Sequence, residues 1–328
     1  MIRIRTGSRL HFGLFSLPSD GATAWPNSEG VPTIPRRAFG GVGMMIDKPG
    51  IELSVERAKA WSSEGPLALR ALEFAQRCAA FLGTKTCFHI RMESAACEHS
   101  GLGTGTQLGL AVATAIDRLI DRGGSTLQAL AASLGRGRRS AIGIHGFSAG
   151  GLIVEGGKNA DVAVAPMLVR YDFPEAWRIV LITPRNLQGK HGAQEIDAFT
   201  RLLGCVRDDA TTDSLCRLVL LGMLPALVDV DIMAFGEALY DFNRRSGLLF
   251  KSAQGGVYCH PRVEEIVLRL RECGVRGVGQ SSWGPAVFAL VAMDQAAALR
   301  DYLIARNIAA LDEITITSAC NHGARTEY

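Results

Sequence analysis

The stretch EHSGLGTGTQLGLAVATAI, from Glu98 to Ile116, decides the fold class of this chain. It opens with a loop in which Gly101, Gly103 and Gly105 alternate with other residues. Glycine tolerates positive φ and lets the backbone come close to a ligand. A helical pattern follows without a break, so the loop and the start of the helix form one unit.

That helix is predicted over 106–120, because apolar residues recur on one face at the helical period. The first turn of a helix offers free N–H groups and a partial positive charge, which suits an anion. The spacing matches neither the Walker nor the dinucleotide-binding glycine motif. We predict that phosphate is bound by Gly101, Gly103, Thr104, Gly105, Thr106 and Gln107. A tight turn with a helix cap remains the alternative.

The composition is typical of a globular protein, and it shows no excess of basic residues of the kind that binds nucleic acid. The chain has 328 residues, which is enough for two domains, with 48% hydrophobic and 20% charged residues and a net charge of +3. No apolar run reaches the roughly 18 residues that a membrane span needs. The first residues resemble a strand and not a signal peptide. We therefore expect a cytoplasmic protein with no nucleic-acid or membrane partner.

The cysteines and histidines show no metal-binding spacing. The eight cysteines are scattered and form no CxxC pair, and no HExxH or HxH cluster occurs. This pattern is typical of buried thiols, and it does not predict a structural transition metal.

Strand-like and helix-like segments alternate in a way that indicates an α+β sandwich. Strands are predicted at 2–5, 51–55, 88–92, 152–154, 163–171, 177–183, 286–291 and 314–317. Helices are predicted at 66–82, 106–120, the segment from Ser125 to Gly135, 194–204, 212–222, 231–246, 262–273 and after Asp294. Ser125 and Gln128 suggest a capping box. The proline-rich piece between the first strands reads as a functional loop. A boundary near 172–177 divides the chain into domains 1–173 and 174–328.

Five motifs, spread over nearly the whole chain, carry a family resemblance. They are GSRLHFGLF (Gly7–Phe15), AFGGVGMMID (Ala38–Asp47), EHSGLGTGTQLGLAVA (Glu98–Ala113), HGFSAGGLIVEGG (His145–Gly157) and GQSSWGP (Gly279–Pro285). The third is similar to the GLGSS motif of the GHMP kinase superfamily, with Gly105 in place of the second serine. In this order the set resembles the β-ribofuranosylaminobenzene 5′-phosphate synthase family of methanopterin biosynthesis.

The resemblance implies a fold and a reaction. The fold would be GHMP kinase-like, with an N-terminal ribosomal S5-like domain and a C-terminal ferredoxin-like domain. The reaction would join 5-phosphoribosyl-1-pyrophosphate to 4-aminobenzoate or 4-hydroxybenzoate, with loss of pyrophosphate and carbon dioxide. Mg²⁺ would be the cofactor, with ligands that the sequence does not identify, and the protein would be a homodimer. An ATP-dependent small-molecule GHMP kinase is the alternative, although the motif HGFSAGG lacks the aspartate that such kinases often carry there.

Candidate site residues follow from the motifs. Arg9, His11 and Glu98 are the candidates for catalysis. Alternatively, Arg9 forms a surface ion pair, His11 is a core histidine, and Glu98 caps the loop. Substrate contacts are predicted for Gly40, Gly41, Gln280, Ser281, Ser282 and Trp283. Trp283 would either stack on the benzoate ring or pack in the core. The run RGRR (136–139) is expected to be a solvated loop, and GKHGAQEIDAF (189–199) either closes over the site or simply starts a helix.

Overall fold

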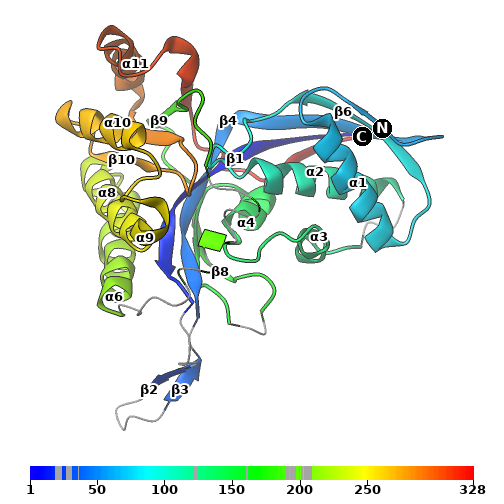
Figure 1. The fold of residues 1–328 in the computed structure, drawn as a ribbon, viewed down its shortest axis with the longest axis horizontal. Helices are drawn as coiled ribbons and strands as arrows, with labels where there is room; N and C mark the ends of the chain where they lie inside the picture. Colours follow the sequence, from blue (N-terminus) through cyan, green and yellow to red (C-terminus); the bar gives the residue numbers. More distant parts are fainter. Residues whose placement is uncertain are drawn as a thin grey trace.

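The computed structural model describes residues 1–18, 24–26, 32–35, 37–120, 124–159, 162–189, 192, 197–198, 200, 202 and 209–328. Two main sheets, one of seven strands and one of four, form the framework (Figure 1). Strands β2 (Ala24–Pro26) and β3 (Pro32–Pro35) pair as a separate hairpin that projects from the body. The proline-rich piece predicted as a loop therefore contains a short hairpin.

The seven-stranded sheet has the order β13-β1-β4-β6-β5, and β7 pairs with both β4 and β8. Its strands are β1 (Ile2–Ser16), β4 (Phe39–Ala58), β5 (Ser62–Glu64), β6 (Cys87–Ser94), β7 (Leu152–Glu155), β8 (Met167–Tyr171) and β13 (Arg325–Glu327). The pairing of β1 with β4 has register shifts at Thr6/Ser8 and at His11/Gly13. The sequence predicted that the first strand ends at Arg5, which was wrong: Arg9 and His11 lie inside β1. Irregularities of this kind re-aim side chains within a strand.

Four helices accompany this sheet, and their buried faces form its core. They are α1 (Ala68–Leu82), α2 (Thr104–Leu119), α3 (Leu127–Ser133) and α4 (Ile142–Ala149). Phe74 of α1 and Leu108 of α2 pack in one buried cluster with Phe88 of β6. The predictions of α1 and α2 are confirmed, and Gly83 ends α1 with a φ of 67° as a left-handed C-cap.

The start of α3 differs from the prediction by one residue. Thr126 is the N-cap, and its hydroxyl accepts a hydrogen bond from the Ala129 N–H. Ser125 instead donates to the Asp117 carboxylate at 2.6 Å. The capping box proposed for Ser125 and Gln128 was therefore wrong, because a neighbouring hydroxyl takes the cap position.

The four-stranded sheet has the order β10-β11-β9-β12 with every pair antiparallel. Its strands are β9 (Trp177–Ile182), β10 (Gly277–Gln280), β11 (Val287–Ala292) and β12 (Ile314–Thr317). The helical segments of this half are α6 (Asp209–Leu218), the π-helical turn Val219–Met223, α7 (Leu224–Val228), α8 (Ile232–Leu248), α9 (Lys251–Gln254), α10 (Pro261–Glu272) and α11 (Ala296–Ala305). Along the chain, helices lie between β9 and β10 and again between β11 and β12. This succession, with the observed strand order, is ferredoxin-like.

Side chains of α8 join the two sheets. The Asn243 amide donates to the carbonyl oxygens of Phe12 in β1 (2.6 Å) and Gln280 in β10 (2.9 Å). Ser246 bonds both the N–H and the carbonyl of Leu14. The chain ends lie side by side because β13 pairs with β1 (Figure 1). The division at residues 173 and 174 stays a prediction, and the last strand belongs to the first sheet.

One helical stretch, Ala210–Val228, is long and apolar enough to cross a membrane by length and composition alone. Leu215, Val219 and Met223 of this stretch are buried in the same cluster as Phe235 and Phe288. Its inner side thus packs in the core of the second half of the chain.

Candidate active site

A cleft of about 540 Å³ lies where the glycine loop and β1 face α8, α9 and β10. One wall comes from the first half of the chain and the other from the second. Ten of the predicted site residues line it: Arg9, His11, Gly101, Gly103, Thr104, Gly105, Thr106, Gln280, Ser282 and Trp283. The structure therefore brings three of the five sequence motifs, Gly7–Phe15, Glu98–Ala113 and Gly279–Pro285, together around one cavity.

The glycine loop has the backbone conformation that the sequence predicted. Gly101 and Gly103 have φ values of 89° and 71°, and α2 begins at Thr104 directly after Gly103. A Cβ atom on Gly101 would lie 2.1 Å from the Ser281 carbonyl oxygen, so no larger residue fits there. The Arg9 N–H donates to the Leu102 carbonyl at 2.8 Å and fastens the loop to β1. The first turn of α2 thus opens into the cleft with the N–H groups that a helix start leaves for an anion.

Three arginines approach the two inner glycines of this loop. A Cβ atom on Gly103 would lie 3.1 Å from the Arg9 Nε atom. A Cβ atom on Gly105 would lie 2.6 Å from a guanidinium nitrogen of Arg70 and 3.3 Å from one of Arg136. Glycine at these positions therefore makes room for guanidinium groups as well as for a ligand.

The cleft is strongly positive. Among the described residues that line it are five arginines, at 9, 70, 136, 138 and 139, and no aspartate or glutamate. Residues 136–139 form a loop, as predicted, in which Arg138 is exposed and Arg136 and Arg139 are half-buried, and all three arginines line the cleft. Arg136 lies over the Phe74 ring at 5.1 Å, a contact between residues far apart in the sequence. Guanidinium groups bind phosphate oxygens in a planar, forked geometry, so the cleft suits a polyanion.

Glu98 and His99 stand at the entrance of the loop. Glu98 forms an ion pair with Arg70, and it does not line the cleft. His99 lines the cleft and has a φ of 57°. Glu98 can therefore act on a ligand by orienting Arg70, while its direct catalytic role stays a prediction.

His11 is buried, with an exposed fraction of 5%. Its backbone N–H donates to Ser281 Oγ, and its carbonyl accepts from the Ser282 N–H, both at 3.0 Å. Burial, helped by the charge of Arg9, holds the pKa of His11 well below its ordinary value. The imidazole is therefore neutral at pH 7, and its Nε2 atom has no hydrogen-bond partner among the described residues.

The GQSSWGP motif positions the glycine loop and also lines the cleft. Ser281 Oγ donates to the Gly101 carbonyl at 2.8 Å, but Ser281 itself is fully buried and does not reach the cavity. The Gln280 side chain bonds the Cys259 N–H and the Ser282 carbonyl. Trp283 packs edge-to-face on Phe250 with ring centroids 5.2 Å apart, and it borders the cleft.

Three other predicted site residues lie away from the cleft lining. The Gln107 amide is fully buried, where it accepts from Thr6 Oγ1 and donates to the Gly143 carbonyl, both at 2.8 Å. Gly40 and Gly41 belong to β4, and a Cβ atom on Gly41 would lie 2.2 Å from the Gly13 carbonyl oxygen. These glycines thus permit close strand pairing. Because they do not line the cleft, their position does not support the predicted contact with substrate.

A largely aromatic group also lines the cleft, and the sequence analysis identified only Trp283 of it. The group consists of Phe250, Gln254, Val257, Tyr258 and Trp283. The buried Tyr258 hydroxyl and the Gln254 Oε1 atom have no partner among the described residues. Buried polar atoms in proteins are nearly always satisfied, so orphaned ones at a cavity mark the position of a ligand. No local pattern separates these residues from an ordinary helix end.

The described cleft residues do not form a Mg²⁺ ligand set. Mg²⁺ prefers carboxylate, phosphate and water oxygens, and the described lining contains no carboxylate. Threonine and serine hydroxyls are the neutral oxygens present there. Lys190, His191 and Glu195, which could close over the site, lie outside the described residues.

Comparisons with known proteins agree with this architecture. Residues 223–309 match the model of the family described as GHMP kinases C terminal. A mevalonate diphosphate decarboxylase from Staphylococcus aureus (13% identity, TM-score 0.65, covering 100% of this chain and 99% of that one) shares the fold. A homoserine kinase from Cytophaga hutchinsonii does too (14% identity, TM-score 0.62, covering 99% and 97%).

Two curated proteins, both named β-ribofuranosylphenol 5′-phosphate synthase, are similar over most or all of the chain. The protein from Archaeoglobus fulgidus is 31% identical and covers 100% of both chains. The protein from Methanothermobacter thermautotrophicus is 30% identical and covers 88% of both. The chain described here therefore belongs to the β-ribofuranosylphenol 5′-phosphate synthase family of the GHMP kinase superfamily.

Proposed function

We propose that this enzyme joins 5-phosphoribosyl-1-pyrophosphate to 4-hydroxybenzoate, and that it releases pyrophosphate and carbon dioxide in methanopterin biosynthesis. The observation that carries the proposal is the composition of the cleft lining. Five arginines and a glycine loop line the cleft together with aromatic side chains and orphaned polar atoms. The relatives' name describes a phenol product, which favours 4-hydroxybenzoate over 4-aminobenzoate as the first acceptor to test.

The donor would bind against the arginines of the cleft. Phosphoribosyl pyrophosphate carries a 5′-phosphate and a diphosphate, and both groups need charge-assisted donors. Arg9, Arg70 and Arg136 surround the inner glycines, so they would hold one of these groups against the start of α2. Arg138 and Arg139 line the same cleft and would hold the other.

The same groups assist departure of pyrophosphate. The bond between C1 of the ribose and the diphosphate oxygen breaks, and its electron pair leaves with the diphosphate. Negative charge therefore grows on the leaving oxygen while C1 becomes oxocarbenium-like. Fixed N–H groups and guanidinium groups aimed at that oxygen stabilise this state. The neutral His11 imidazole lies beside Arg9 and would donate to, or accept from, the sugar or the leaving group.

The acceptor would bind against the aromatic side chains of the cleft. The ring carbon that bears the carboxylate attacks C1, and the para hydroxyl supplies electron density to that carbon. The carboxyl group then leaves as carbon dioxide, and the electron pair of its bond restores the aromatic ring. No base has to remove a ring proton, which is compatible with a cleft whose described lining lacks a carboxylate. Tyr258 and Gln254 would hydrogen-bond the para hydroxyl or the carboxylate.

Mg²⁺ would enter with the donor. Its ligands would be diphosphate oxygens and water, since the described cleft offers hydroxyl groups and no carboxylate. When bound, it would neutralise part of the diphosphate charge. One solved structure of this fold, a complex with magnesium, is 12% identical with a TM-score of 0.62, and it shows that the fold accommodates the ion.

The ATP-dependent kinase remains the alternative because solved kinases share the fold. A kinase of this kind would use the glycine loop for nucleotide phosphates. The missing carboxylate in the described lining counts against a kinase base, and full-length similarity to the synthases favours ribosyl transfer. The homodimer and the cytoplasmic location stay predictions, and sedimentation of the purified protein would test the first.

The deciding experiment uses purified enzyme, Mg²⁺ and phosphoribosyl pyrophosphate with carboxyl-labelled 4-hydroxybenzoate. Carbon dioxide release that requires phosphoribosyl pyrophosphate and is indifferent to ATP is the expected result. 4-Aminobenzoate is run in parallel to identify the acceptor. Folded protein that binds ATP and releases no carbon dioxide from either benzoate would overturn the proposal in favour of the kinase.

A further inference from the structure

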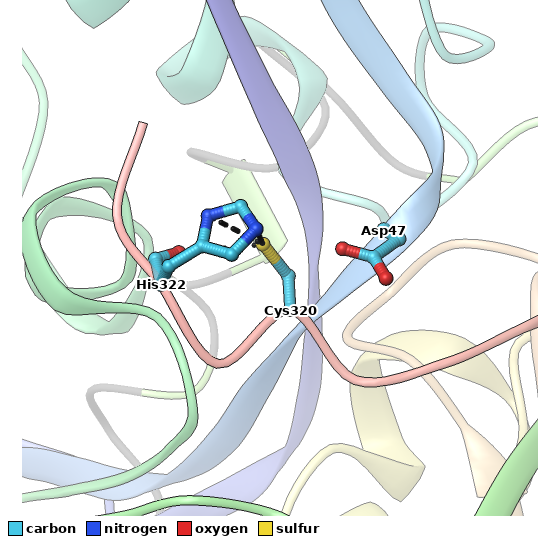
Figure 2. A group of neighbouring side chains, drawn as sticks. All are labelled: Asp47, Cys320 and His322. Carbon is cyan, nitrogen blue, oxygen red and sulfur yellow. Dashed lines mark hydrogen bonds between the residues drawn. The ribbon is translucent and has the colours of Figure 1, made fainter. Parts of the chain in front are cut away.

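A cluster of three metal-binding side chains lies outside the residues that line the cleft. Asp47 follows the long buried run of β4, while Cys320 and His322 belong to the segment before β13 (Figure 2). One oxygen, one sulfur and one nitrogen of these residues all lie within 4.8 Å of one another. The thiol is buried, whereas the carboxylate and the imidazole are exposed, so the cluster is open to solvent on one side.

The hydrogen bond of the His322 ring fixes its tautomer. Nδ1 lies 2.9 Å from the Gly323 carbonyl oxygen, which can only accept, so Nδ1 carries the proton. Nε2 is then the ring nitrogen that remains for a metal. Histidine ligands of metals commonly donate their other ring N–H to a backbone carbonyl in this way.

The ligand atoms lie near enough to one another to share an ion. Cys320 Sγ lies 3.8 Å from His322 Nε2 and 3.6 Å from Nδ1, so the ring has to turn to direct Nε2 at an ion that also touches the sulfur. Zinc–sulfur and zinc–nitrogen bonds at the tetrahedral angle place the two ligand atoms about 3.6 Å apart. Asp47 uses Oδ2 to accept a 2.7 Å hydrogen bond from Ser318, which orients the carboxylate and leaves Oδ1 for a cation.

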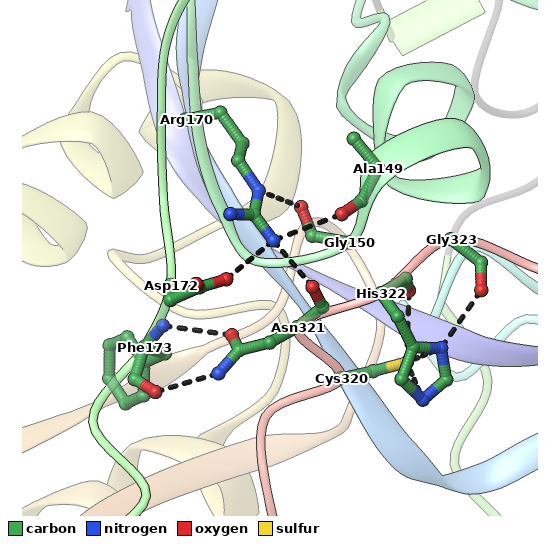
Figure 3. A network of polar contacts seen from close by, with 9 residues as sticks. All are labelled: Ala149, Gly150, Arg170, Asp172, Phe173, Cys320, Asn321, His322 and Gly323. Carbon is green, nitrogen blue, oxygen red and sulfur yellow. Dashed lines mark hydrogen bonds and ion pairs between the residues drawn. The ribbon is translucent and has the colours of Figure 1, made fainter.

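The backbone that carries Cys320 and His322 is fixed on both sides. Asn321 between them exchanges two hydrogen bonds with the Phe173 backbone, at 2.8 and 2.9 Å (Figure 3). Arg170 donates to the carbonyls of Asn321 and Ala149 and pairs with Asp172. These contacts hold the ligand-bearing segment in place without using any ligand atom, which is the support that metal sites require.

Backbone contacts set the position of the segment against β4 and α4. The Cys320 N–H donates to the Met45 carbonyl at 2.9 Å, and the Asp47 N–H donates to the Ser318 carbonyl at 3.0 Å. A Cβ atom on Gly150 would lie 2.4 Å from the His322 backbone nitrogen, so glycine is needed for this approach. Asp47 and Cys320 are therefore brought together by main-chain pairing, before any cation binds.

We propose that Asp47, Cys320 and His322 bind one thiophilic divalent cation, of which Zn²⁺ is the natural candidate, with solvent as the fourth ligand. The ion would clip the C-terminal segment to β4. Three protein ligands with one open position are a common zinc arrangement, and mixed sulfur, nitrogen and oxygen donors exclude Ca²⁺ or Mg²⁺ as the preferred ion. The site is independent of the proposed ribosyl transfer.

Binding exchanges a proton for the metal. Each cation that binds forms one metal–sulfur bond and releases the thiol proton to solvent.

Titration with Co²⁺ tests the proposal, because a cobalt–thiolate bond gives a near-ultraviolet charge-transfer band. The full-length protein, stripped with a chelator, should develop this band with one equivalent of Co²⁺ and lose it when Zn²⁺ is added. Cys320→Ser should abolish the band, and His322→Gln should weaken Co²⁺ binding at least tenfold. The unfolding temperature should rise with Zn²⁺ in the unmodified protein and not in the variants.

Matched controls replace the same residue types elsewhere. Cys273→Ser removes an exposed thiol of the second half, and His89→Gln removes a half-buried histidine beside Glu64. Both should leave the band and the Zn²⁺ stabilisation unchanged. No charge-transfer band in folded unmodified protein, or a band that survives in Cys320→Ser, would overturn the proposal.

Discussion

At the scale of one residue, Arg136 tests the proposal that the cleft binds a polyanion. Its guanidinium lies over Phe74 and next to Gly105, among the arginines that line the cleft. Methionine would keep the packing of the stem and remove the charge. Arg136→Met should lower kcat/KM for phosphoribosyl pyrophosphate roughly tenfold to a hundredfold, which is the usual cost of one charge-assisted hydrogen bond. Steady-state kinetics with varied donor measure this, and Arg300→Met on α11 is the control.

Replacing Tyr258 distinguishes a role of its hydroxyl in ligand binding from a role in stability. Its buried hydroxyl has no partner among the described residues, so Tyr258→Phe removes no hydrogen bond from the free protein. The unfolding temperature should stay the same or rise, while KM for the benzoate should increase roughly tenfold. Kinetics with varied acceptor and a thermal melt measure the two effects. Tyr302→Phe, at an exposed tyrosine, should change neither, and a drop in Tyr258→Phe stability without a KM change would contradict the ligand role.

Glu155 should make stability depend on pH. Burial raises its pKa from 4.5 to about 7, and the Ala141 N–H bonds one of its oxygens. Because the folded-state pKa is the higher one, this contribution to stability is fully present below pH 4.5 and is lost as the pH rises through about 7. The loss amounts to about 3 kcal/mol.

Urea unfolding at pH 5 and at pH 8 measures this contribution. Glu155→Gln cannot ionise at this position. Its unfolding free energy, relative to that of the unmodified protein, should therefore be higher at pH 8 than at pH 5. Parallel pH dependence of the two proteins would show that Glu155 does not ionise as described. Other titrating groups cancel in the comparison because both proteins contain them.

At the scale of the element, the glycine loop runs directly into α2, and we propose that the two bind an anion as one unit. Gly105 lies in the first turn of α2, where alanine would favour the helix by about 1 kcal/mol. Its Cβ atom would, however, displace the Arg70 and Arg136 guanidinium groups. Gly105→Ala should therefore raise KM for phosphoribosyl pyrophosphate severalfold without loss of stability.

Gly101→Ala provides the contrast within the same loop. A Cβ atom there meets the Ser281 backbone and the residue has positive φ, so the folded state should be destabilised as well. Kinetics and melting temperature together distinguish the two glycines. Equal losses of stability in both variants would contradict separate roles for them.

At the scale of the whole molecule, Asn243 holds the two sheets at a fixed spacing around the cleft. Its amide bonds Phe12 of β1 and Gln280 of β10, and all three groups are buried. Asn243→Ala should destabilise the protein by about 2–4 kcal/mol, because buried backbone groups lose their partners. Chemical unfolding measures this, with Gln128→Ala at an exposed amide as the control. Unchanged stability would mean that the sheets are coupled through apolar packing alone.

Local patterns in the sequence were sufficient to predict several elements. The apolar period of α1 and α2, the stop at Gly83 and the conformation of the glycine loop all depend on neighbours within a few residues. The ferredoxin-like half was predicted through the family resemblance, but β10 was missed. That strand has four residues, two of which are glycine, so it carries no period-2 signal.

The sequence by itself determined the family, the conformation of the glycine loop and the class of reaction, because residues close together in the chain carry those signals. Only the tertiary structure placed Arg136 beside Gly105, turned Tyr258 toward the same cleft, and brought Asp47 next to Cys320 and His322. These contacts join residues distant in sequence through strand pairing and core packing. Their chemistry depends on distances that no spacing along the chain encodes.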